Sequence, residues 1–238
     1  MKLKSPIFYI TILLLTACSV QYNLVSHSES SMDVKSEKDS LAATIIAPYK
    51  LAIDSVMNEV LCVSDMEMKK GKPESLLGNF VTDLCLQQYA DVADICIMNN
   101  GGLRASLPKG KITRGKIYEL MPFENELVVL KLSKYDFLRL LDYLVSRGGE
   151  PFSGLSIKMN AEGKHSSYII YNQTNFEKGE RIRVLTSDYL ANAGDKMYFF
   201  KGKKQKKVGI KLRDAIINYC LSKDTISSKL DNRLSTAE

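Results

Sequence analysis

Apolar and polar residues form blocks along this chain that separate a leader, a polar tether and a folded region. Residues 1–17 combine a basic start with a predominantly apolar run. Residues 18–40 are rich in Ser, Asp, Glu and Lys, a composition typical of a flexible tether. From residue 41 onward, apolar residues recur at the spacings of helices and strands, so we expect the folded domain to occupy residues 41–238.

Apolar residues spaced by three or four positions predict several helices in this domain. The predicted helices cover residues 41–61, 74–90, 134–147 and 208–222, with one or two helical turns over 113–121. Ser40, Thr113 and Ser133 stand where N-capping side chains are expected, and the two glycines at 148–149 provide a stop signal. Pro48 lies inside the first helix, so we expect a kink or a break there.

Short apolar or alternating runs between these helices predict strands. The predicted strands cover residues 59–68, 93–98, 125–133, 152–160, 166–173 and 181–190, and a polar tail follows the last helix. Helices and strands do not alternate strictly, and three strands gather in the last third of the chain. The pattern predicts an α+β fold, a single domain with a mixed β-sheet flanked by helices.

The first residues, "MKLKSPIFYITILLLTAC", predict a secretory signal. Its apolar run is shorter than a membrane-spanning helix usually requires. Its end, Leu15-Thr16-Ala17-Cys18, resembles the lipobox of bacterial lipoproteins. That resemblance implies cleavage before Cys18 and acylation of its thiol, with a plain signal peptide as the alternative. We therefore expect an exported bacterial lipoprotein, held at the membrane through its lipid only, in the outer membrane facing the periplasm.

Charge and cysteine content narrow the function classes. Removing Lys2 and Lys4 with the leader lowers the formal net charge from +6 to +4, which gives no reason to expect a nucleic-acid partner. The four cysteines that remain besides Cys18 show no C-x-x-C spacing; they are Cys62, Cys85, Cys96 and Cys220. Because Cys85 and Cys96 lie in apolar patterns, we favour buried free thiols over disulfides.

The small number of histidines and the lack of a nucleophile motif argue against several types of catalytic centre. The chain has two histidines, His27 in the tether and His165 in a predicted hairpin turn, whereas a two-metal hydrolase gathers several around its ions. We expect no metal cofactor in this chain, and the sequence has no G-x-S-x-G nucleophile elbow. The run "KGKKQKK" at 201–207 could attract phosphate, but a solvated surface loop is the favoured interpretation.

The stretch "DICIMNNGGLRASLP" is the strongest candidate for a binding site. A buried strand there ends in Asn99-Asn100-Gly101-Gly102, which presents amides and permits close approach of a ligand to the backbone. Arg104 follows with a planar five-donor group that suits phosphate or carboxylate.

Two further segments complete a set of binding groups. Phe123 follows Pro122 just before a strand, and Tyr189 and Asp195 flank a stretch of small residues. Two aromatic faces can stack on a base, and a carboxylate can accept hydrogen bonds from ribose hydroxyls. Core packing of Phe123 and a capping role for Asp195 are the structural alternatives. Taken together, these residues predict a nucleotide or nucleoside site.

At these motifs the sequence resembles the C-terminal, substrate-recognition domain of the 5'-nucleotidase family. Residues 99–104 are similar to the family's N-G-G-G-I-R, 121–123 to L-P-F and 189–195 to F-L-A-x-G-G-D. Residues 74–79 are similar to E-x-x-L-G-N, 153–155 to S-G-L, and the tail "KLDNRLS" to L-D-G-R-I.

The resemblance implies the fold of that domain and, by position, a set of roles. Phe123 and Tyr189 clamp the base, Asn99 hydrogen-bonds it, Asp195 binds ribose and Arg104 faces the phosphate.

The resemblance also includes departures. It implies close backbone approach at Gly149, although the "GGEPF" loop is shortened. Residues 69–73 hold lysines where family members often carry an arginine, and Asn100, Ala193 and Lys196 replace family glycines. These differences leave the preferred substrate open.

The largest departure concerns the second domain of the family enzymes. Family enzymes carry a metallophosphoesterase domain ahead of this one, whereas the folded region here follows a short tether. We therefore expect a nucleotide-recognition component of a split 5'-nucleotidase in nucleotide catabolism, with the divalent metals on a separate metallophosphoesterase subunit. A stand-alone nucleotide-binding lipoprotein and a degenerate domain for protein contacts are the alternatives.

Overall fold

A computed structural model describes residues 28–33, 39–171 and 180–236. The chain divides into two units, Met1–Thr44 and Ile45–Glu238. The predicted signal segment and Cys18 lie outside the described residues. Helix α2 (Ser40–Met57) begins at the end of the first unit, where the backbone N–H groups of Leu41 and Ala42 donate to the Asp39 carboxylate. Asp39, and not the predicted Ser40, therefore caps this helix.

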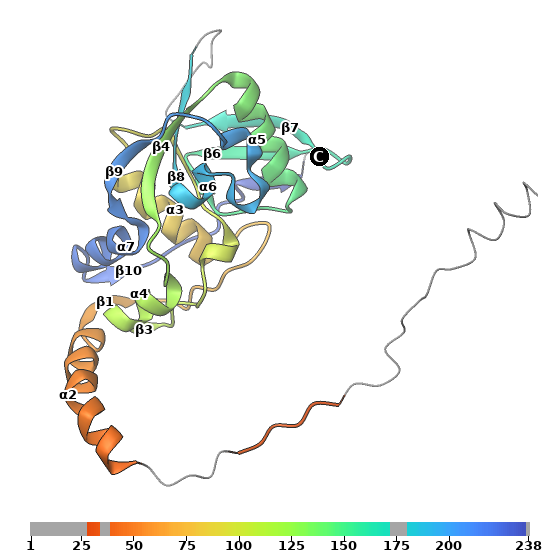
Figure 1. Ribbon diagram of the computed structural model, residues 1–238. Helices are drawn as coiled ribbons and strands as arrows, with labels where there is room; N and C mark the ends of the chain where they lie inside the picture. Colours follow the sequence, from red (N-terminus) through yellow and green to blue (C-terminus); the bar gives the residue numbers. More distant parts are fainter. Residues whose placement is uncertain (1–27, 34–38, 172–179, 237–238) are drawn as a thin grey trace, which may run out of the picture. The chain divides into compact units, whose positions relative to one another are not determined.

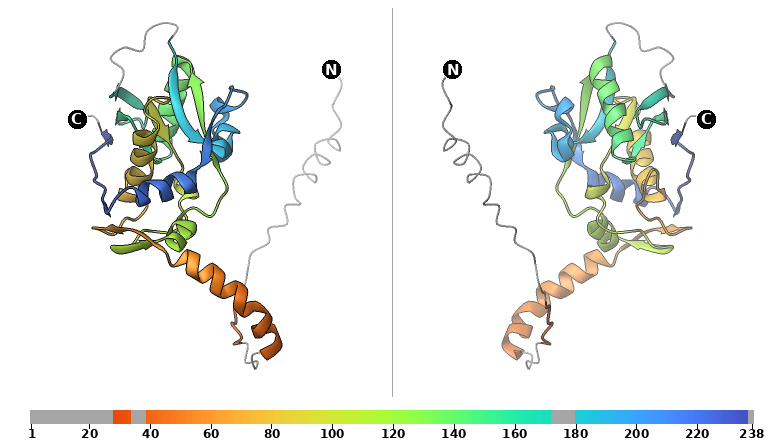
Figure 2. Two further views of the ribbon diagram at one scale, coloured as in Figure 1. Left: turned by 90° about the vertical axis from the view of Figure 1, so that its left-hand side faces the viewer. Right: turned by 90° about the vertical axis from the view of Figure 1, so that its right-hand side faces the viewer.

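A five-stranded sheet forms the centre of the second unit. Its strands, in spatial order, are β5 (Phe152–Ser153), β2 (Ile95–Ile97), β8 (Ile182–Ser187), β4 (Glu126–Leu132) and β9 (Lys206–Lys211). Strands β2 and β8 run parallel, and the other neighbours run antiparallel, so the sheet is mixed as predicted. Figure 1 shows β4 and β8 side by side, and two further views agree (Figure 2).

Two smaller sheets and several helices surround this sheet. The first sheet joins β10 (Thr225–Ile226), β1 (Val60–Ser64) and β3 (Gly110–Thr113), and the second joins β11 (Leu234–Thr236), β6 (Leu155–Met159) and β7 (His165–Ile170). The longer helices are α3 (Leu76–Gln88), α4 (Arg114–Leu120), α5 (Lys134–Ser146) and α7 (Leu212–Leu221). Short helical turns are η1 (Asn100–Gly102), α6 (Asp188–Ala191), η2 (Gly194–Lys196) and η3 (Tyr198–Phe200). The fold is α+β.

Alternation along β4 divides the core into two layers, because successive side chains of a strand point to opposite faces. Leu127 and Val129 join one apolar cluster with side chains of α3, α4 and α7. Val128, Leu130 and Leu132 join the other with side chains of α5 and of β6. The sheet is thus covered on both faces, and its strand ends and loops are left to carry polar groups.

Several sequence-based predictions of local structure are confirmed. The hydroxyls of Ser133 and Thr113 accept from the backbone N–H groups of Asp136 and Lys116, so they cap α5 and α4. Cys62, Cys85, Cys96 and Cys220 are all free and buried. Their thiols belong to the core layer shared by α3 and α7.

The predicted helix over 208–222 is wrong in its first turn. Residues Lys206–Lys211 form β9, and α7 begins at Leu212. Gly209 has a φ of +90°, which no helix accommodates, and the edge of β4 offers backbone partners to the incoming chain. The predicted polar tail likewise contains β10 and β11, which complete the two smaller sheets. These edge pairings depend on distant strands that a local pattern does not reveal.

Two predicted strands are broken where the backbone turns. The segment 152–160 divides into β5 and β6 at Gly154, whose φ of +87° and close approach to the Asp94 carbonyl exclude a side chain. The segment 181–190 ends as a strand at Ser187, whose hydroxyl caps the single turn of α6. His165 begins β7 rather than lying in the hairpin turn.

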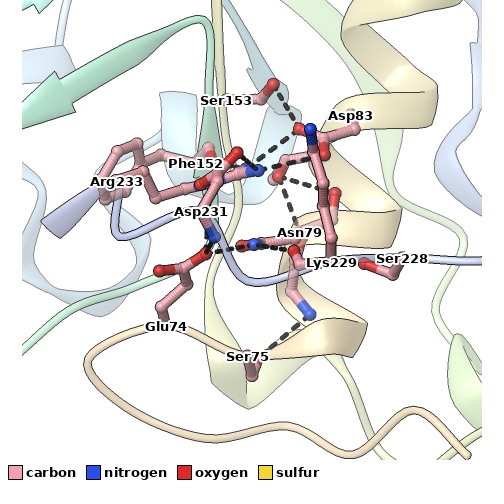
Figure 3. Close-up of polar contacts among 12 residues, drawn as sticks. Glu74, Ser75, Asn79, Asp83, Phe152, Ser153, Ser228, Lys229, Asp231 and Arg233 are labelled. Atoms are coloured by element: carbon pink, nitrogen blue, oxygen red, sulfur yellow. Dashed lines mark hydrogen bonds and ion pairs between the residues drawn. The ribbon is translucent and has the colours of Figure 1, made fainter.

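Arg233 fixes the C-terminal segment to the domain (Figure 3). Its guanidinium is almost fully buried and donates to the Asp83 carboxylate at 2.9 and 3.1 Å and to the Asp231 carboxylate at 2.9 Å. It also donates to the Phe152 carbonyl at 2.7 Å. One side chain therefore joins α3, β5 and the segment that leads into β11, which satisfies a buried charge with several acceptors.

We predict that Arg233→Met lowers the free energy of unfolding by about 3 kcal/mol at pH 7 in urea titrations, because it leaves carboxylates and a buried carbonyl without their donor. The hydrogen bond from Arg233 holds the pKa of Asp231 below its usual value. This stabilisation is present above the unfolded pKa of about 3.9 and is lost as pH falls through the lowered pKa. The difference between Arg233→Met and wild type should therefore shrink as pH falls below the unfolded pKa.

Lys164→Met, which removes one exposed cation from the β6–β7 hairpin, is the matched control and should change stability by less than about 0.5 kcal/mol. An Arg233→Met protein as stable as wild type at pH 7 would contradict this role for the guanidinium.

Candidate functional site

A cavity of about 360 Å³ collects most of the residues that the sequence singled out. It is lined by Asn99, Gly101, Gly102, Arg104, Phe123, Asn125, Tyr189 and Asp195. These residues come from three segments: the turn after β2, the turn before β4, and the α6–η2 region after β8. Five of the six side chains or backbone positions predicted to bind the ligand are thereby brought together from distant parts of the sequence.

Asn99 is held at the end of β2 by two sets of contacts. Its side chain is largely buried, and its Nδ2 donates to Asp195 Oδ2 at 2.6 Å. Gly102 passes close to the same side chain, since a Cβ there would lie 2.9 Å from Asn99 Oδ1. The glycines of this turn therefore make room for the Asn99 amide as well as for a ligand.

Glu150 contacts the backbone of this turn and was not predicted from the sequence. Its buried carboxylate accepts from the backbone N–H of Asn100 at 2.7 Å. Lys72 and Arg147 lie 3.8 and 3.5 Å from the same carboxylate and balance its charge. The signal in the sequence was an acidic residue directly after a Gly-Gly pair, which is too common a pattern to interpret alone.

Asp195 is positioned by two tyrosines. The Tyr189 hydroxyl donates to Asp195 Oδ1 at 2.9 Å, and the Tyr143 hydroxyl donates to the Asp195 carbonyl at 2.8 Å. The hydrogen bond to Asp195 raises the pKa of the Tyr189 hydroxyl. Each carboxylate oxygen of Asp195 has one protein donor and can accept another hydrogen bond from a ligand.

The backbone around Asp195 is strained. Ala193, Asp195 and Lys196 have φ values of 71°, 50° and 66°, a region that costs a residue with a side chain about 1–2 kcal/mol. Gly194 between them packs under Tyr189, since a Cβ there would lie 2.5 Å from Cε1 of the ring. Such strain persists where surrounding contacts hold it, and it concentrates at ligand sites.

Phe123 and Tyr189 expose 42% and 45% of their surface while lining the same cavity. Phe123 is therefore not a core residue, which was the structural alternative. Arg104 is fixed through its backbone N–H, which donates to the Leu120 carbonyl at 2.8 Å. Among the described residues its guanidinium has no carboxylate partner, and its one hydrogen bond is a 3.4 Å contact to the Gly101 carbonyl. The group is available to an anion.

Asn125 adds an amide that the sequence analysis did not include. It lines the cavity two residues after Phe123, in the same turn before β4. Its position in "PFENE" beside the aromatic candidate was the available signal.

Gly149 lies elsewhere. It follows α5 with a φ of +98°, and its N–H donates to the Leu144 carbonyl at 2.9 Å, as expected of a residue that ends a helix. A Cβ at Gly149 would lie 2.0 Å from the Pro73 carbonyl oxygen. Its close approach is therefore to the chain's own backbone, and it does not line the cavity.

In the parts of the chain that the structure describes, no group of three or more His, Cys, Asp or Glu side chains could hold a metal ion. His165 instead contacts Asp142, with 2.5 Å between Nδ1 and a carboxylate oxygen. The described residues thus do not fit a dimetal centre.

Comparison with known proteins gives a consistent result. A family model, "5'-nucleotidase, C-terminal domain", matches residues 56–202, which include every residue that lines the cavity. The trifunctional nucleotide phosphoesterase protein YfkN of Bacillus subtilis is 27% identical over 175 residues, which are 68% of this chain and 11% of YfkN. An apyrase of Tabanus yao is 27% identical over 187 residues, which are 66% of this chain and 34% of the apyrase.

Solved structures share the fold. A 5'-nucleotidase precursor from Thermus thermophilus superimposes with a TM-score of 0.68 at 23% identity, over 82% of this chain and 43% of that one. The NAD nucleotidase of Haemophilus influenzae gives 0.66 at 19% identity, over 84% and 42%. This chain therefore spans less than half of each of these relatives. By its sequence match and its fold, the chain belongs to the family of 5'-nucleotidase C-terminal domains.

Proposed function

We propose that this chain is the nucleotide-recognition component of a split 5'-nucleotidase. In this proposal the cavity holds the nucleotide, and a separate metallophosphoesterase chain supplies the divalent metals and hydrolyses the phosphate ester. The observation that carries it is the hydrogen-bonded set Asn99–Asp195–Tyr189 beside the exposed ring of Phe123. Family membership supports the same class of ligand.

The chemistry of the cavity suits each part of a nucleotide. The rings of Phe123 and Tyr189 offer stacking surfaces, and stacking on an aromatic side chain contributes about 1–3 kcal/mol per base. Asp195 has free acceptor capacity for vicinal ribose hydroxyls, and the Asn99 and Asn125 amides can hydrogen-bond a base edge. Arg104, whose guanidinium lacks a carboxylate partner among the described residues, can pair with the phosphate.

The exposed face of α2 supports a protein partner. Ile45, Ile46, Tyr49, Ile53 and Val56 recur at helical spacing, and each exposes half or more of its surface. Exposed apolar stripes of this kind typically mark interaction surfaces. We propose that the metallophosphoesterase chain covers this face.

The composition of α2 favours a protein over a lipid bilayer. The helix is long and apolar enough to cross a membrane by those two criteria. Crossing would place the Lys50–Asp54 ion pair in hydrocarbon, which is costly. Helices that lie on a membrane surface usually carry several cations on their polar face, whereas α2 has one lysine, and that lysine is paired with an aspartate.

We also propose that Cys18 carries the lipid that anchors this chain in the bacterial outer membrane, facing the periplasm. The motif Leu15-Thr16-Ala17-Cys18 at the end of an apolar leader supports this placement. The polar residues 19–40 then separate Cys18 from the domain.

Binding of AMP tests the recognition site. Tyr189→Ala removes a stacking surface and the hydroxyl that holds Asp195, so calorimetric titration should show an affinity about 10- to 100-fold weaker than wild type. Tyr189→Phe keeps the ring and should fall between the two. Tyr198→Ala, which removes an exposed tyrosine outside the cavity lining, is the control and should bind like wild type. Unchanged affinity in Tyr189→Ala would favour a degenerate domain.

Hydrolysis tests the split arrangement. The chain alone, assayed with AMP and divalent metal, should release no phosphate above background. Addition of a metallophosphoesterase chain without a recognition domain, encoded nearby, should start turnover. Robust turnover by the purified chain alone would refute the proposal, and AMP binding with no productive partner would identify a stand-alone binding protein.

Substitution on α2 tests the docking face. Tyr49→Glu with Ile53→Glu places charge on the apolar stripe, so it should weaken partner binding at least 10-fold in pull-down or calorimetry while AMP affinity stays unchanged. Ser55→Glu, on the polar side of the same helix, should leave partner binding unchanged. Equal loss in both variants would show that α2 is not the docking face.

A further inference from the structure

A second cavity, of about 670 Å³, shares no lining residue with the first and is strongly basic. The cations that line it are Lys131, Arg181, Arg183, Lys203, Lys204 and Lys206. Asp91 is the one acidic residue of the lining, and valines form its apolar part. We call this cavity the basic groove. It contains part of the lysine run that the sequence analysis had interpreted as a solvated loop.

Adjacent strands build the basic groove. Lys131 on β4 lies directly opposite Arg183 on β8, and Lys206 on β9 lies opposite Val129 on β4. Directly opposed residues of antiparallel strands place their side chains on one face, so these three cations share a side of the sheet. Like charges in such positions repel and destabilise the sheet. The pairing therefore brings the positive charge of Lys131 next to Arg183 on this face.

The internal ion pairs neutralise only part of this charge. Arg183 pairs with the buried carboxylate of Asp94 at 2.6 Å, and Lys203 pairs with Asp136 at 2.5 Å. For Lys131, Lys204 and Lys206, the described part of the chain provides no ion pair. Three ammonium groups thus remain for a ligand.

The groove and the nucleotide cavity lie at opposite ends of one strand pair. Asn125 precedes β4 and Tyr189 follows β8, whereas Lys131 lies near the end of β4 and Arg183 near the start of β8. The pairing runs from Leu127–Ser187 at one end to Lys131–Arg183 toward the other. With about 3.3 Å per residue, these two pairs are roughly 13 Å apart. The groove is a separate site rather than an extension of the first.

We propose that the basic groove binds a ligand carrying two or more clustered phosphate groups. Several lysines without carboxylate partners suit a multiply charged anion, and lysine binds phosphate as a point charge. Single-stranded nucleic acid is disfavoured because no aromatic side chain lines the groove to stack with bases. Soluble polyphosphate and the phosphates of lipid headgroups share this chemistry, and the experiment separates them.

Calorimetric titration with inorganic tripolyphosphate tests the proposal on the soluble chain without its leader. Wild type should bind, more weakly as NaCl rises because salt screens the charges. Lys131→Gln with Lys206→Gln should lower the affinity at least 10-fold. The matched control, Lys111→Gln with Lys158→Gln, removes two exposed lysines elsewhere and should bind within about twofold of wild type.

Two readouts exclude a simple folding defect or a nonspecific charge effect. AMP affinity should be the same in wild type and in both double variants, because no residue changed lines the nucleotide cavity. The midpoint of thermal unfolding without ligand should also stay close to that of wild type in both double variants, because all four substituted lysines are exposed. This readout is independent of the proposed function.

Vesicles of phosphatidylglycerol in phosphatidylcholine form the second arm, measured by co-sedimentation. Vesicle binding that needs Lys131 and Lys206, without tripolyphosphate binding, would assign the groove to lipid phosphates. Binding of neither probe, or an equal loss in the control pair, would overturn the proposal.

Discussion

The hydrogen bond from Asn99 Nδ2 to Asp195 Oδ2 joins two segments that are 96 residues apart, and the shape of the candidate site depends on it. Asn99 is fixed because it lies two residues after a fully buried strand, β2. Asp195 is held in a left-handed backbone conformation by the hydroxyls of Tyr143 and Tyr189. The carboxylate thus sits beside an exposed ring with acceptor capacity left over. That combination is costly to fold, and strain of this kind clusters at functional sites.

In the central sheet, the residues that stabilise the fold and the candidate binding groups lie in different places. Its two faces are covered by apolar side chains, while its ends carry polar groups. One end of the β4–β8 pair leads into the aromatic and amide groups of the candidate nucleotide cavity. The other end leads into the lysines and arginines of the basic groove. The apolar stripe of α2 is a third feature that the domain's own core does not use. Each suits a different partner: a nucleotide, a clustered phosphate and a protein.

Features that depend on a few neighbouring residues were predicted well from the sequence, whereas features that depend on contacts between distant segments were not. The caps at Thr113 and Ser133 and the α+β class followed from short patterns. Strand β9 was missed because its pairing with β4 depends on a distant partner. Five of the residues proposed from motifs line one cavity, whereas Glu150 was not predicted because its role depends on burial against the Asn100 backbone. The position of Gly149 could not be predicted from the sequence either, because it is set by packing against Pro73.

The most direct test of the account is to observe the two rings while AMP is added. Aromatic ¹³C-labelled protein, titrated with AMP and followed by NMR, should show ring-current shifts at Phe123 and Tyr189. Resonances of Tyr135 and Tyr198, which are exposed and outside the cavity lining, should stay in place. Two results would contradict the claim that nucleotides bind between these two rings. One is a set of shifts confined to other aromatic residues, and the other is saturation of AMP binding without any shift at Phe123 and Tyr189.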